Sequence, residues 1–89
     1  MLISRLEDPV SVSLGGGERA MLSTRNDSYI TLNETAAVIW DMLETPCEFD
    51  DLMQGLLERY KADRSEIEPE VRNLLKVMEQ RRLIAVSRP

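Results

Sequence analysis

Catalysis by protein side chains requires groups that transfer protons, attack a substrate or bind a metal, and this sequence contains few of them. It has no histidine and a single cysteine, Cys47. Cys47 follows Pro46 in an expected surface loop and has no evident base partner. We therefore interpret Cys47 as a solvated or half-buried thiol rather than a nucleophile.

Other patterns that would indicate a reactive or ligand-binding site are also missing. One cysteine without histidine argues against zinc, and residues 34–51, with six acids and no base, lack the spacing of a calcium loop. Gly15-Gly16-Gly17 is not followed by Lys-Ser or Lys-Thr, which excludes a phosphate-binding P-loop. We expect a binding protein with no catalytic residue, no metal and no cofactor.

Length and charge restrict the class of protein. The chain has 89 residues, enough for one domain spanning residues 1–89, and 43% apolar residues predict a packed core. Eleven basic against sixteen acidic residues give a net charge of −5, which disfavours nucleic acid as the main partner. The start of the sequence has no long apolar run, so we expect a cytoplasmic protein without a membrane segment.

The first part of the chain predicts three short strands joined by turns. Val10–Leu14 alternates apolar and polar residues, the three glycines form a turn, and Arg19–Thr24 is a second strand. Arg25–Ser28 has turn chemistry, and Tyr29–Leu32 is the third strand. Short strands with tight turns indicate an antiparallel sheet.

From Asn33 onward the apolar period becomes helical. Asn33 is a suitable N-cap for a first helix that ends near Thr45-Pro46. A second helix is expected over roughly Phe49–Lys61, with a poor cap at Glu48. One face of the first helix is predicted to be core, formed by Ala36, Ile39, Trp40 and Leu43.

The third helix has more than one candidate start, between Arg64 and Pro69. Ser65 with Glu68 fits a capping box, and Pro69 fits a first helical position. Arg81-Arg82 is expected to close the last turn, and the apolar tail Leu83–Val86 either packs on the helices or adds a strand. The fold class is therefore α+β and winged-helix-like, a three-stranded antiparallel sheet followed by three helices in the order β-β-β-α-α-α.

The third strand runs directly into the first helix. Tyr29–Leu32 carries no charge and no proline, so at a sheet edge it would be a template for an added peptide strand. The alternative is that this strand is central or covered by the C-terminal tail, and the residues alone leave both open.

The stretch YITLNETAAVIWDML resembles the strand-to-helix region of the PqqD family, named for coenzyme PQQ synthesis protein D. FDDLMQGLLERYKADRSEIEPEVRNLLKVMEQRRLIAV is similar to that family's next two helices and apolar tail. The resemblance covers roughly residues 10–86. It implies a recognition element that binds the leader of a ribosomally made precursor peptide and presents it to a modifying enzyme.

The same resemblance implies where the leader would lie. It would pair with the backbone of Ser28, Tyr29, Ile30 and Thr31 and rest against the third helix. The helical flank beside the core stripe holds Glu70, Asn73, Leu74, Val77 and Arg81. Val77 is otherwise a tolerated surface valine and Arg81 a dipole partner. Five bases against one acid over residues 72–88 would suit an acidic leader.

Several functional hypotheses follow. In PQQ synthesis the partner enzyme would be a radical SAM enzyme, and in lasso-peptide or related maturation it would be a leader peptidase. The alternative from another class is a winged-helix DNA-binding regulator, opposed by Glu66, Glu68 and Glu70 at the start of the would-be recognition helix. A third is a structural subunit that docks on an enzyme without contacting its substrate.

Overall fold

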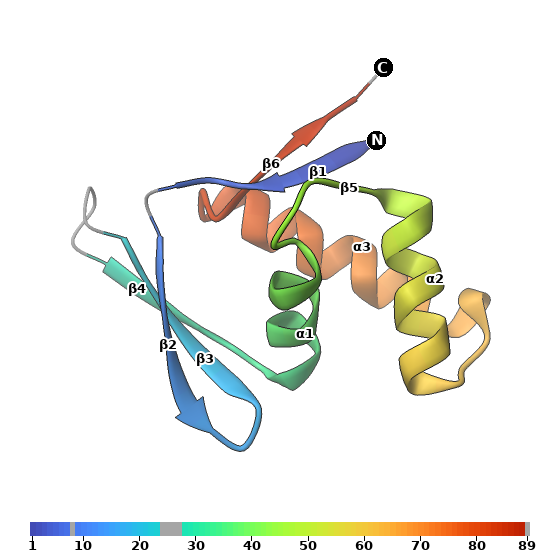
Figure 1. Cartoon of the computed structure of the whole chain (residues 1–89), viewed down its shortest axis with the longest axis horizontal. Coiled ribbons are helices and arrows are strands. Elements are labelled where there is room, and N and C mark those ends of the chain that lie inside the picture. The colour runs from blue at the N-terminus through green and yellow to red at the C-terminus, as the bar shows by residue number, and fades with distance from the viewer. Residues whose placement is uncertain (8, 24–27, 89) are drawn as a thin grey trace.

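The computed structural model describes residues 1–7, 9–23 and 28–88. The predicted α+β class is confirmed, with three strands of a meander preceding three helices (Figure 1). The elements in chain order are β1 (Leu2–Arg5), β2 (Val10–Gly15), β3 (Glu18–Ser23), β4 (Ser28–Leu32), α1 (Glu34–Met42), β5 (Cys47–Glu48), α2 (Phe49–Tyr60), α3 (Arg64–Gln80) and β6 (Ile84–Ser87).

The meander β2–β3–β4 forms one three-stranded antiparallel sheet with β3 in the middle. Gly15, Gly16 and Gly17 have φ of 83°, 61° and 83°, the left-handed region that glycine enters without steric cost, and they form the predicted turn between β2 and β3. Of the turn predicted at Arg25–Ser28, the first three residues lie outside the described part of the chain.

A second sheet was not predicted. It has the order β5-β1-β6, and β1 pairs antiparallel with β6 from Leu2↔Ser87 to Arg5↔Ile84. The C-terminal tail therefore forms a strand, which lies beside the N-terminus and not on the meander (Figure 1). The pairing β1–β6 joins the two ends of the chain, and four-residue strands are too short for alternation alone to identify them.

The helix boundaries confirm some expectations and correct others. Asn33 caps α1 as predicted, since its Oδ1 accepts a hydrogen bond from the backbone N–H of Ala36 at 2.9 Å. Glu48 precedes α2 without a side-chain cap bond, also as expected. The capping box at Ser65 and Glu68 is wrong, because α3 begins at Arg64 after Asp63, whose backbone carbonyl accepts from Glu66 and Ile67.

Two further positions in and after α3 differ from expectation. Pro69 does not start the helix but lies within it, where its missing N–H leaves the carbonyl of Ser65 without its intrahelical donor. Arg81 is the C-cap and Arg82 has a left-handed φ of 60°, so both residues follow the last turn rather than closing it.

One hydrophobic core joins both sheets and all three helices. The predicted stripe of α1 is buried at Ala36, Ile39, Trp40 and Leu43. The other fully or nearly buried apolar side chains come from every layer: Ile3, Met21, Leu32, Ala37, Phe49, Leu52, Met53, Leu56, Val71, Leu75, Met78, Leu83 and Ile84. The inner face of the meander contributes Met21 and Leu32, so this sheet is anchored on one face only.

Arg5 connects the second sheet to α1. Its Nε donates to the carbonyl of Trp40 at 3.0 Å, and its guanidinium carbon lies 4.3 Å from the centre of the Trp40 ring. The last turn of α1 has no basic residue of its own. Arg5 therefore supplies the positive charge that the C-terminal end of a helix favours, and it fixes β1 against the core.

The role of β1 can be tested with two substitutions on one strand. Ile3 is fully buried and Leu2, its neighbour, is 40% exposed. We expect Ile3→Ala to lower the free energy of unfolding by about 2–5 kcal/mol, measured by urea denaturation. Leu2→Ala is the matched control and should cost much less. Equal losses for both variants would show that β1 is not part of the core.

Candidate functional site

The β4 strand is an edge of the meander. It pairs with β3 through five residue pairs, from Arg19↔Leu32 to Ser23↔Ser28, and no other described strand pairs with it. The C-terminal tail, which could have covered β4, pairs with β1 instead. Of the two arrangements that the residues left open, the structure therefore has the one with β4 exposed at an edge.

The side chains of β4 alternate between two different environments. Ile30 lies on the inner face opposite Met21 and packs against the core. Tyr29 lies on the outer face opposite Leu22 and is 71% exposed. Thr31 shares the outer face, opposite Ala20. A strand added to β4 would likewise direct alternate side chains toward the helices and toward solvent.

The corner after β4 lies beside α3. A cavity of about 120 Å³ is lined by Thr35, which follows the Asn33 cap, by Leu56 and Tyr60 of α2, and by three residues of α3. The α3 residues are Ile67, Glu70 and Val71. None of Thr35, Tyr60 and Ile67 was predicted as a site residue, because an apolar period does not distinguish a partly exposed side chain from a buried one.

Of the predicted flank of α3, Glu70 lines this cavity. Leu74 and Val77 are half-buried, and Glu70, Asn73 and Arg81 are exposed. Leu74 packs against the core, whereas Val77 lies outside the core cluster. Val77 is therefore a partly exposed apolar side chain that the core does not explain.

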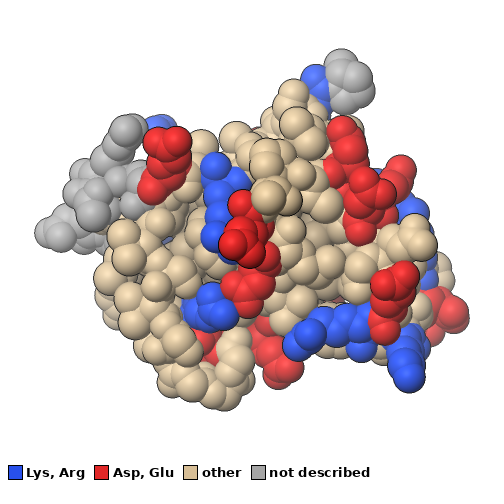
Figure 2. Space-filling view, in the orientation of Figure 1, with Lys and Arg blue, Asp and Glu red and all other residues tan. Residues whose placement is uncertain are grey.

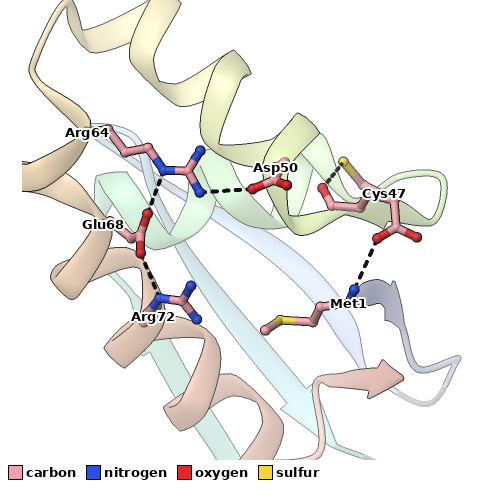
Figure 3. Close-up of polar contacts among 7 residues, drawn as sticks. Met1, Cys47, Asp50, Arg64, Glu68 and Arg72 are labelled. Carbon is pink, nitrogen blue, oxygen red and sulfur yellow. Dashed lines mark hydrogen bonds and ion pairs between the residues drawn. The ribbon is translucent and has the colours of Figure 1, made fainter. Parts of the chain in front are cut away.

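One acidic residue near the start of α3, Glu68, is paired with two arginines. Glu68 accepts hydrogen bonds from Arg64 and from Arg72, and Arg64 also donates to Asp50 of α2 at 2.9 Å (Figure 3). These bonds hold the pKa of Glu68 below its ordinary value, with Arg64 the larger cause. Because Arg64 contacts Asp50 as well as Glu68, this exposed network adds a polar contact between α2 and α3.

The basic end of α3 is only partly neutralised. Arg72 pairs with Glu68, and Arg88 pairs with Glu79 at 3.2 Å. Among the described residues, neither Arg81 nor Arg82 has an ion pair. The free positive charge therefore gathers where α3 ends.

A second hollow lies on the opposite flank of α3. This cleft of about 340 Å³ is lined by Phe49, Leu75, Lys76 and Val86, among others, and the guanidinium of Arg72 lies 4.4 Å from the centre of the Phe49 ring. It is separated from β4 by the helix, so it does not belong to the edge described above. This cleft could not be predicted from sequence periodicity, because the residues that line it come from the N-terminus, α2, α3 and β6.

Cys47 is half-buried in β5 and not in a surface loop as predicted. Its Sγ donates to the carbonyl of Glu48 at 3.3 Å (Figure 3). Burial raises the pKa of the thiol, and the charges of Asp51 and Glu48 raise it further. A raised pKa lowers the fraction of reactive thiolate at neutral pH.

The described residues contain no group of three side chains suited to holding a metal ion. None of the helices in the described part of the chain is long and apolar enough to cross a membrane.

Residues 18–84 match the family described as Coenzyme PQQ synthesis protein D (PqqD). The chain belongs to the PqqD family. The matched region extends from the start of β3 to the start of β6 and includes β4 and α3. No curated protein sequence matches the chain significantly.

The PqqD-family chain also resembles a solved structure, described as TbiB1 in Complex with the TbiA(beta) Leader Peptide. The TM-score is 0.83 at 20% sequence identity, and the match covers 97% of this chain and 99% of that chain. The two proteins share one fold over nearly their whole length.

The environment of Cys47 predicts that its thiol reacts slowly with alkylating reagents. We expect Asp51→Asn to speed alkylation by iodoacetamide at pH 8 severalfold, because it removes a nearby negative charge that opposes the thiolate. Glu44→Gln, at an exposed acid between α1 and β5, is the control and should leave the rate unchanged. A wild-type rate above that of free cysteine would contradict the assignment of an inert thiol.

Proposed function

We propose that this protein binds the leader segment of a ribosomally synthesised precursor peptide by β-strand addition to β4. The observation that carries the proposal is the open edge of β4, which pairs with β3 alone among the described strands and has no charged residue or proline to block another strand. Backbone pairing at Ser28, Tyr29, Ile30 and Thr31 would supply affinity that depends little on leader sequence.

Specificity would come from the α3 side of the edge. Leader side chains that point to the inner face would lie toward Glu70, Asn73, Leu74, Val77 and Arg81. Val77 offers apolar surface outside the core, and Arg81 has no ion pair among the described residues. An apolar leader residue followed by an acidic one would suit this flank.

The protein would not catalyse a reaction itself but would present the bound peptide to a maturation enzyme. The absence of histidine and the raised pKa of Cys47 support this role. The enzyme would be a radical SAM enzyme in PQQ synthesis or a leader peptidase in lasso-peptide maturation, and the genes adjacent to this one identify which. The related fold of TbiB1, described with a leader peptide, supports the same reading.

A DNA-binding role is not favoured by any feature of the site. In a winged-helix regulator α3 would enter the major groove, yet Glu66 and Glu70 are exposed near its start. Arg64 and Arg72, which could contact phosphates, are already paired with Glu68.

The flank of α3 can be tested by calorimetry with the cognate leader peptide. Val77→Asp and Arg81→Ala should each weaken binding by about 1–3 kcal/mol, roughly 5- to 150-fold, because each removes one side-chain contact. Lys76→Ala, which removes a basic residue about 100° away from Val77 on the same helix, is the matched control and should bind like wild type. Wild-type affinity in folded Val77→Asp and Arg81→Ala would place the leader elsewhere.

The edge itself can be tested with proline. Successive backbone N–H groups of a strand point to opposite neighbours, so one of Ile30 and Thr31 directs its N–H toward β3 and the other toward the open edge. We expect one of Ile30→Pro and Thr31→Pro to remain folded by circular dichroism yet lose leader binding. The other should be destabilised. If a folded proline variant binds the leader normally, strand addition at β4 is wrong.

A further inference from the structure

The outer face of the meander is apolar and uncovered. Strand pairing places Val10, Leu22 and Tyr29 in one row across the three strands, and Val12, Ala20 and Thr31 in the next. Val10 is 51% exposed, Val12 43%, Leu22 40% and Tyr29 71%. We call the surface formed by these six residues the outer face.

Exposed large hydrophobic residues are concentrated on the meander. Leu14, at the end of β2, is also 53% exposed, so five of the eight large exposed hydrophobic residues described lie on this one sheet. Alternation places one charged residue of the three strands on the same face, Glu18, at its hairpin end. The lower left of Figure 2, over β2 and β3, accordingly carries few charged side chains.

The size of this surface bears on what covers it. From the exposed fractions of its side chains, the apolar area is on the order of 500 Å², in the range of patches that are often functional on monomers. A stable interface usually takes about 800 Å² from each partner. The outer face alone is therefore too small for a stable dimer of this chain, whose net charge of −5 also opposes self-association.

The outer face is continuous with the β4 edge. Tyr29 and Thr31 belong to both, and a strand added to β4 would extend the sheet and direct every second leader side chain to the same side. A bound leader would thus enlarge the apolar surface from three strands to four. The complete surface exists only when the leader is present.

We propose that the outer face docks the leader-modifying enzyme through an uncharged, apolar surface of that enzyme, and that the bound leader strand completes the interface. This inference rests on the proposed function. It explains how a protein without catalytic groups can deliver a peptide selectively. The enzyme would contact the outer face and the outward leader side chains at the same time, so it would bind the loaded protein best. It also explains why the meander retains exposed valines and leucine that contribute nothing to the core.

The test uses variants on β2, the strand separated from the leader edge by β3 and β4. Val10→Lys and Val12→Lys place a charge on the outer face, and β2 is exposed along its whole length, so folding should be preserved. Ser13→Lys is the matched control on the opposite face of the same strand. It faces Arg19, whose charge is already paired with Asp41 at 2.8 Å.

Three quantities are measured: affinity for a synthetic leader, affinity of the leader-loaded protein for the modifying enzyme encoded beside this gene, and mass in solution by analytical ultracentrifugation. We expect leader affinity to be unchanged in all three variants. Enzyme affinity should fall at least about tenfold in Val10→Lys and Val12→Lys, as for loss of an interface anchor, and stay at the wild-type level in Ser13→Lys. Wild-type protein without leader should bind the enzyme more weakly than loaded protein.

Two results would overturn the inference. One is normal enzyme binding by Val10→Lys and Val12→Lys with leader bound, which would place the enzyme elsewhere. The other is a wild-type dimer that both variants abolish, which would assign the outer face to a second copy of the chain. Failure of the wild-type protein to bind any leader would refute the proposed function instead. The leader-affinity measurement shows this independently of the enzyme-binding measurement.

Discussion

The hydrogen bond from the backbone N–H of Ala36 to Oδ1 of Asn33, 2.9 Å long, fixes the junction on which the candidate site depends. Only Asn33 separates the end of β4 from the start of α1, and Leu32 and Ala36 on either side are both buried in the same core. The end of the strand is therefore anchored to the helical layer. An edge strand that is open and anchored in this way is suited to receive a peptide in one register.

The second constraint is that the meander is anchored on one face. Met21, Ile30 and Leu32 hold its inner face to the helices, and the bidentate pair Arg19–Asp41 adds a contact to α1. Among the described strands, this leaves both the β2 and the β4 edges of the meander unpaired, and it leaves the outer face uncovered. The remaining surfaces of the core are enclosed by α2, α3 and the small sheet in which β1 joins β6, so binding would not require the core to open.

The features that could be predicted from sequence are local ones. The Asn33 cap, the buried stripe of α1 and the glycine turn each depend on residues close together in the chain. The second sheet could not be predicted, since Leu2–Arg5 pairs with Ile84–Ser87 near the other end of the chain and both strands are very short. The start of α3 at Arg64 lies at one end of the predicted range, but neither the Ser65 capping box nor Pro69 begins the helix. Pro69 is tolerated inside α3 because tertiary packing stabilises the helix. The flank around Val77 was derivable as a helical face, but the cavity at Thr35 and Tyr60 depends on how three helices meet.

The most direct test of strand addition is an isotope-labelled titration with the leader peptide, followed by nuclear Overhauser and amide-exchange measurements. The account predicts cross-strand contacts between the leader backbone and residues 28–32. It also predicts new protection of the edge amides of β4, while the β2 amides remain as they are in the free protein. Leader contacts confined to the cleft of Phe49 and Lys76, with the β4 edge still exchanging freely, would contradict it.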